Sequence, residues 1–199
     1  MKRRRAHLPA RCGRPARVYI ACDVSHLLEP AASGRSRCRG CARPIGRGEL
    51  RFGERLPNPF ADGEITVWFH PLCAAYKRPE PLLETLAESN ENLPDRAALE
   101  RAAHASLEHR RLPRIDGAER ASSGQAACRS CRQPIARGTW RIRLAFYEEG
   151  RFSPGGFIHL DCRREYFETD VAADLVLHFS AALSEGEREE LRRACGGAA

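Results

Sequence analysis

Two matched sets of cysteine and histidine residues constrain the fold of this chain more than any other feature. The first set reads Cys-x2-Cys, then 28 residues, then His-x2-Cys, and the second repeats this pattern with 27 intervening residues. Each set supplies three thiolates and one imidazole, which are the donors of a closed tetrahedral Zn²⁺ site. The sequence therefore predicts two structural zinc ions with no open coordination position. The expected ligands are Cys38, Cys41, His70 and Cys73 in the first set, and Cys128, Cys131, His159 and Cys162 in the second.

The number and spacing of the cysteines argue against a disulfide framework. The chain has nine cysteines, and an odd number with close Cys-x2-Cys pairs argues against paired disulfides. Cys12, Cys22 and Cys195 are left over. A third metal site using His7 and His26 is one alternative for the first two, but their spacing matches no tight chelate. We therefore expect buried or free thiols.

The repeat extends beyond the metal ligands. Residues 38–52 and 128–142 share both cysteines, the arginine after the first cysteine, Pro-Ile, Arg-Gly and a later arginine. Chance Cys-x2-Cys pairs, or redox dithiols of the thioredoxin type, do not explain this flanking identity. The chain is therefore predicted to contain two copies of one unit, each small enough to need a metal for stability.

These observations predict an α+β fold class with two tandem, small, zinc-stabilised domains. Each domain is expected to be a short antiparallel sheet with flanking helices. The predicted boundaries are a basic flexible arm over 1–17, a first module over 18–112 and a second module over 113–199.

Hydrophobic pattern and turn signals give the expected elements. The leftover histidines His104, His109 and His178 are expected to be surface or packing residues. Ser184 and Glu187 form a capping box that predicts the start of the last helix. Strands are expected over 17–22, 50–55, 64–69 and 140–147, helices over 70–76, 94–111, 162–169 and 185–194, loops over 57–63 and 152–156, and a connector over 112–124.

The charge is unevenly distributed along the chain. The net charge is +7, and residues 1–17 carry seven basic residues and no acid. Such an arm either attracts phosphates or is a solvated tail. The ranges 33–60 and 120–151 each hold seven arginines and two glutamates, whereas acids concentrate in 80–100 and 185–190. This predicts one anion-facing side and one acidic, helical side.

No apolar run is long enough for a transmembrane helix, and no apolar segment follows the basic N-terminus. We therefore expect no membrane partner and an intracellular location. That location would be the nucleus in a eukaryote, or the cytoplasm and nucleoid in a bacterium.

The pattern Ser-Gly-Arg-x-x-Cys-x-x-Cys, continued by Phe-x-Asp-Gly-x-Ile-x-x-Trp-x-His-x-x-Cys, spans residues 33–73. It resembles the zinc finger of poly(ADP-ribose) polymerases, which also occurs in one DNA ligase family. Ser123-Gly124-Gln125 and Phe157-Ile158-His159 begin and end the corresponding pattern of a second copy. The resemblance covers roughly residues 28–195.

The resemblance implies a compact α+β finger that recognises DNA breaks rather than DNA sequence. In that family, a surface near the Ser-Gly-Arg segment grips phosphates and an apolar loop tip stacks on the exposed base pair. Arginine forks suit phosphate oxygens, and a duplex end offers an unstacked π-face. The resemblance implies two groups of candidate residues in this sequence. The phosphate-contacting candidates are Ser33, Gly34, Arg35, Arg37 and Gln125, and the loop-tip candidates are Phe60, Ile65 and Phe152.

This sequence departs from the family pattern in three places. Ala61 stands where the family has a bulky stacking residue, so that role either passes to Phe60 or is weakened. Gln125 replaces the gripping arginine in the second copy. The stretch 148–156 lacks the Asp-Gly turn, which leaves Phe152 as the alternative tip. The first finger is therefore the expected DNA binder, whereas the second adds affinity or contacts protein.

These features predict a non-enzymatic, zinc-dependent protein that binds DNA ends, nicks or gaps without sequence preference. The alternative is a zinc-stabilised interaction adaptor that docks a protein partner through its acidic helices. An enzyme is disfavoured, because the sequence offers no open metal site, no paired carboxylates and no nicotinamide-dinucleotide pocket.

Overall fold

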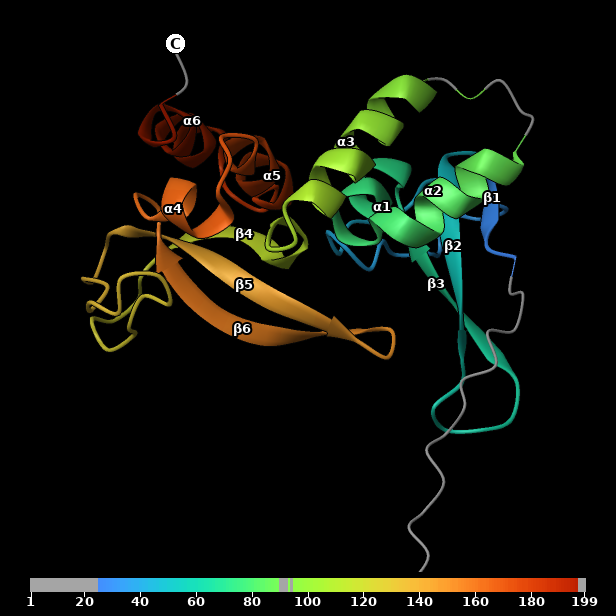
Figure 1. Cartoon of the computed structure of the whole chain (residues 1–199), viewed down its shortest axis with the longest axis horizontal. Coiled ribbons are helices and arrows are strands. Elements are labelled where there is room, and N and C mark those ends of the chain that lie inside the picture. Colours follow the sequence, from blue (N-terminus) through green and yellow to red (C-terminus); the bar gives the residue numbers. More distant parts are fainter. Residues whose placement is uncertain (1–24, 90–92, 94, 197–199) are drawn as a thin grey trace, which may run out of the picture.

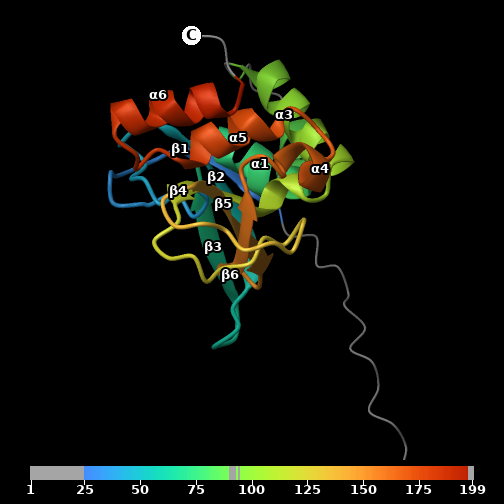
Figure 2. The same ribbon diagram turned by 90° about the vertical axis from the view of Figure 1, so that its left-hand side faces the viewer.

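Two three-stranded antiparallel sheets, one in each half of the chain, carry the helices on one side (Figures 1 and 2). This computed structural model describes residues 25–89, 93 and 95–196. The predicted basic arm, the predicted strand over 17–22, and His7, Cys12 and Cys22 lie outside the described residues. The predicted α+β fold class with two tandem zinc-type modules is confirmed.

The first module pairs its strands in the order β1-β2-β3, and three helices follow them along the chain. Its elements are β1 (Leu27–Pro30), β2 (Leu50–Pro57), β3 (Glu64–Phe69), α1 (Pro71–Lys77), α2 (Pro79–Glu88) and α3 (Arg96–Glu108).

The second module begins with a 3₁₀ turn and pairs its strands in the order β4-β5-β6. Its elements are η1 (Leu112–Arg114), β4 (Ile115–Arg120), β5 (Trp140–Glu148), β6 (Arg151–His159), α4 (Arg163–Phe167), α5 (Ala172–Phe179) and α6 (Glu185–Ala194). The predicted capping box of Ser184 and Glu187 is present at the start of α6.

The two modules share their backbone design. Cys38 N–H donates to the carbonyl of Arg43 at 2.8 Å, and Cys128 N–H donates to Gln133 at 2.9 Å. The residue after the second cysteine has a positive φ in both turns, 59° and 64°. An ion pair is also repeated: Glu29–Arg51 on the first sheet corresponds to Glu119–Arg141 on the second. The predicted repeat is therefore structural as well as sequential.

The second sheet differs from the prediction. Residues 152–156 were expected to form a loop but belong to β6, and the connector over 112–124 contains β4. The β5–β6 turn contains only Glu149 and Gly150, both with positive φ, which is the geometry of a tight two-residue hairpin. Pro154 is accommodated because β6 is an edge strand and the register shifts between Leu144 and Ala145. Strand β1 and the helices α2 and α5 were not predicted.

The tip of the β5–β6 hairpin docks on the first sheet. A Cβ atom added to Gly150 would lie 3.1 Å from Leu56 Cδ1, 3.5 Å from Val67 and 3.8 Å from Ile65. Arg39 Nε donates to the Gly150 carbonyl at 3.1 Å. A glycine is needed here both for its φ of 78° and for this close approach.

A buried polar network joins the modules behind this tip. The carboxylate of Glu54 is 1% exposed and accepts bonds from Arg78 Nε at 2.9 Å and from the Tyr147 hydroxyl at 2.8 Å. Burial and the Glu54 carboxylate raise the pKa of Tyr147, so its hydroxyl stays protonated and donates. Nearby, the Lys77 amine donates to the carbonyls of Pro113 and Ile115. The Glu54–Arg78 pair lies within the first module, whereas the bonds of Tyr147 and Lys77 cross to the other module and form only on docking.

No helix of the described part of the chain combines the length and the apolar character that a membrane crossing requires.

Glu54→Gln is expected to destabilise the zinc-loaded protein by about 3 kcal/mol, because Arg78 would keep its charge without a carboxylate partner. Urea unfolding measures this change. The control is Glu84→Gln on the exposed face of α2, with an expected effect within about 0.5 kcal/mol. Equal stability of the two variants would show that the Glu54 network does not stabilise the fold.

Candidate metal centres

The first predicted set converges on one point. Cys38 and Cys41 lie in the turn before β2, His70 follows β3 and Cys73 lies in the first turn of α1. Each contributes one donor atom, and these four atoms lie within 4.8 Å of one another. The His70 ring presents Nδ1, which lies 3.4 Å from Cys41 Sγ and 3.9 Å from Cys73 Sγ.

The second set converges in the same way. Cys128 and Cys131 lie in the turn before β5, His159 ends β6 and Cys162 precedes α4. His159 again presents Nδ1, at 3.4 Å from Cys131 Sγ and 3.8 Å from Cys162 Sγ. In each module the backbone N–H of the histidine donates to the first cysteine sulfur at 3.3 Å.

The protonation of the thiols shows why each set needs a cation. Hydrogen bonding to Cys38 lowers the pKa of Cys41, whereas Cys38 and then Cys41 raise the pKa of Cys73. In the second set, burial opposes ionisation of Cys128, but backbone N–H groups outweigh it and bring its pKa to about 7. Burial and then the neighbouring thiols raise the pKa of Cys162 to about 12. Three thiolates can therefore coexist only around a positive ion.

Each histidine is oriented by a partner on its other ring nitrogen. His70 Nε2 lies 3.4 Å from a carboxylate oxygen of Glu49, and His159 Nε2 lies 3.2 Å from the carbonyl of Pro134. Such partners fix the tautomer so that Nδ1 carries the lone pair for the metal. Two Cys₃His sites of this donor set fit two Zn²⁺ ions, each in a closed structural site.

The first site also receives a residue from the second module. His178 on α5 places Nε2 3.1 Å from Cys73 Sγ, and its ring packs edge-on against Tyr76 at 5.3 Å. A ring N–H donated to a ligating thiolate stabilises its negative charge. The sequence indicated His178 only as a surface or packing residue. No spacing signal could reveal it, because 105 positions separate it from Cys73.

The two metal sites differ in how well the protein shields their cysteine ligands from water. Cys38 and Cys73 are buried, and Arg43 Nε donates to Cys41 Sγ at 3.5 Å. In the second site Cys131 is exposed, and the position of Arg43 is taken by Gln133. The first site is thus better shielded from water and has more N–H donors to sulfur.

The phosphate-contacting candidates lie on the loop that contains the first zinc turn. Gly34 and Arg35 are exposed, Ser33 is half-buried, and Arg37 donates to the carbonyl of Ala42 at 3.1 Å. No ion pair holds the Arg35 guanidinium within the described part of the chain. The corresponding residue of the second module, Gln125, is exposed as well.

The three tip candidates lie in different environments, and only Phe60 is an exposed loop residue. Phe60 lies in the β2–β3 loop and is 76% exposed. Ile65 lies on β3, partly covered by the docked Gly150. Phe152 lies on β6 rather than at a loop tip, and its ring packs against Tyr147 at 4.8 Å.

His178→Ala is expected to lower the zinc affinity of the first site about tenfold or more, with no change in the second site. Titration with a competing chelator measures both affinities. His178→Phe keeps the ring but removes the donor, so it should lose affinity equally. His104→Ala, exposed on α3, is the control. Unchanged affinity in His178→Phe would show that the N–H to sulfur bond plays no part.

Comparison with known proteins finds a family match for the segment that holds the first site. Residues 29–110 match the zinc-finger region of poly(ADP-ribose) polymerase and DNA ligase. A poly(ADP-ribose) polymerase of Drosophila melanogaster is 27% identical over 158 residues, which cover 70% of this chain and 16% of the relative. The rice poly(ADP-ribose) polymerase 1 is 27% identical over 143 residues, covering 66% of this chain and 14% of the relative.

A shorter stretch is more similar. It is 40% identical over 50 residues to the Caenorhabditis elegans poly(ADP-ribose) polymerase 1, covering 25% of this chain and 5% of that protein. The chain thus spans about one sixth, 16%, of the length of the fly enzyme that it matches. Residues 29–110 are thus similar to the zinc-finger region of poly(ADP-ribose) polymerase and DNA ligase, and the second half of the chain repeats the ligand set and the sheet of this segment.

Proposed function

We propose that this chain binds DNA without reading its sequence and that it prefers ends, nicks or gaps. The exposure of Phe60 is the observation that carries the proposal. This ring is 76% exposed at the tip of the β2–β3 loop, whereas the next most exposed large hydrophobic residue of the described chain, Val171, is 38% exposed. An exposed aromatic ring can stack on a base, and a terminal base pair offers a flat π-face for it.

Arginines of the first zinc loop supply the phosphate contacts in this proposal. Arg35 and Arg47 are exposed, and neither has an ion pair within the described residues. The zinc turn holds this loop in place through Cys38 and Cys41. Guanidinium groups that are fixed in position bind phosphate oxygens of any sequence, which accounts for binding without base selectivity.

The second module has a different part in this proposal. Its hairpin tip, Gly150, is occupied by docking, and Phe152 is covered by Tyr147. The Arg151 guanidinium lies 4.9 Å from the centre of the Phe60 ring. We propose that the second module orients the Phe60 loop from one side and leaves its other face for the DNA end.

A non-enzymatic role follows from the proposed site. Both metal centres use four protein donors, which leaves no open position for a reacting water. The relatives are named poly(ADP-ribose) polymerases, and the matched segment is their zinc-finger region. An intracellular location is part of the proposal, because the ligand is DNA.

Phe60→Ala is expected to weaken binding to nicked or blunt-ended duplex by about tenfold, because one base–aromatic stack contributes about 1–3 kcal/mol. Fluorescence anisotropy at fixed salt compares these duplexes with closed circular DNA of the same sequence. The wild-type chain should prefer the broken DNA, and Phe60→Ala should remove that preference. Val171→Ala is the control for losing an exposed hydrophobic side chain.

Two further variants in the same assay separate end recognition from phosphate contact. Arg35→Ala should weaken binding to every duplex alike and reduce the salt slope by about one. Gln125→Ala, at the equivalent position of the second module, should change little. Equal wild-type affinity for broken and closed DNA would refute break recognition. No DNA binding by a fully zinc-loaded chain would favour an adaptor that docks a protein through its acidic helices.

A further inference from the structure

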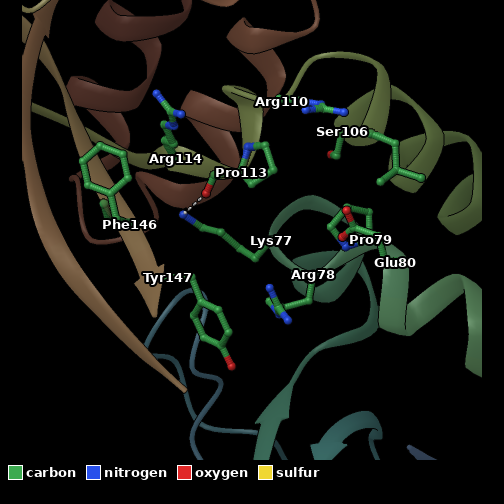
Figure 3. Close-up of a pocket in the computed structure, with 12 residues that line it drawn as sticks. Lys77, Arg78, Pro79, Glu80, Ser106, Arg110, Pro113, Arg114, Phe146 and Tyr147 are labelled. Carbon is green, nitrogen blue, oxygen red and sulfur yellow. Dashed lines mark hydrogen bonds between the residues drawn. The ribbon is translucent and has the colours of Figure 1, made fainter. Parts of the chain in front are cut away.

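A cavity of about 670 Å³ lies where the two modules meet (Figure 3). Its walls come from the α1–α2 junction, the end of α3, the η1 turn and strand β5. Both modules must be docked for this cavity to exist. Its volume is within the range of pockets that bind small ligands.

The cavity has an excess of positive charge. Lys77, Arg78, Arg110 and Arg114 line it, and Glu80 is the one carboxylate among its described lining residues. The amine of Lys77 is occupied by two backbone carbonyls. Arg78 is neutralised by Glu54, which lies behind the wall. The charges still available to a ligand are therefore those of the remaining two arginines and of the Glu80 carboxylate, which leaves a net positive charge.

Arg110 and Arg114 have no ion pair within the part of the chain that the structure describes. Arg110 is exposed in the turn after α3, and Arg114 is half-buried in η1. The Arg114 guanidinium lies 5.1 Å from the centre of the Phe146 ring, which orients it at the cavity wall. Two guanidinium groups without carboxylate partners at one cavity are suited to a phosphate-bearing anion.

The rest of the wall is apolar and offers no free polar side chain. Pro79, Leu107, Pro113 and Phe146 contribute apolar surface. The hydroxyl of Ser106 donates to the carbonyl of Ala102, and the hydroxyl of Tyr147 is bonded to Glu54. A ligand body would thus be held by apolar contact, without hydrogen bonds from these hydroxyls to discriminate one base from another.

We propose that this cavity binds a nucleoside diphosphate, with its phosphates on Arg110 and Arg114 and its nucleoside against the apolar wall. The site is separate from the proposed DNA surface, because neither Phe60 nor Arg35 lines it. A failure of DNA binding would therefore leave this proposal in place.

Isothermal titration of the full, zinc-loaded chain with ADP, CDP, adenosine and inorganic phosphate tests this proposal. ADP and CDP should bind with affinities within about threefold, whereas adenosine should not bind at the same concentrations. The double variant Arg110→Ala/Arg114→Ala should weaken ADP binding by more than about tenfold. Arg101→Ala, an exposed arginine of α3 outside the cavity, should bind ADP as the wild type does.

Four results of the calorimetry would overturn the proposal: no heat with millimolar ADP, unchanged ADP binding in the double variant, phosphate binding as tight as ADP, or tight binding of adenosine. Zinc content and thermal unfolding confirm that the double variant is folded. The affinity of the double variant for a nicked duplex is measured as well. If the double variant loses nicked-DNA affinity as strongly as Arg35→Ala does, the cavity belongs to the DNA surface, and the separate nucleotide site is refuted.

Discussion

Repulsion among closely spaced thiolates is the constraint on which the structure depends. Each module brings three cysteine sulfurs and one imidazole within 4.8 Å, and the thiols cannot all ionise in that space without a cation. Zn²⁺ resolves the conflict, and in doing so it fixes the turn before the second strand and the start of the helix that follows the third. The loop with Arg35 and the strands that present Phe60 are both anchored to the first of these sites.

Docking of the modules adds a second level of organisation. The Tyr147 hydroxyl of the second module bonds to Glu54 of the first, which also pairs with Arg78 of its own module, and Gly150 contacts the first sheet closely. His178 extends this interface to the first metal site through Cys73. We therefore expect zinc binding in one module to depend on the position of the other, which two independent fingers would not show.

The sequence predicted the features that depend on local spacing. Both ligand sets, the strands β2, β3 and β5, and the capped helix α6 followed from cysteine spacing, alternation and the Ser184 capping box. Strand β6 could not be predicted in this way. Pro154 and the two glycines after it are typical of loops, and only their pairing with β5 makes them part of a strand. Long-range contacts were equally hidden, since His178 and Tyr147 act through residues 105 and 93 positions away.

Hydrogen exchange of the full chain, with zinc bound and after chelation, tests most directly whether zinc organises both modules and their docking. Removing zinc should expose backbone amides in the two zinc turns and also in the β5–β6 hairpin, because the docked Gly150 depends on an ordered first sheet. Exchange that is unchanged after complete removal of zinc would contradict a metal-dependent fold. Exposure of the turns alone, with the hairpin still protected, would contradict the coupling between zinc and docking.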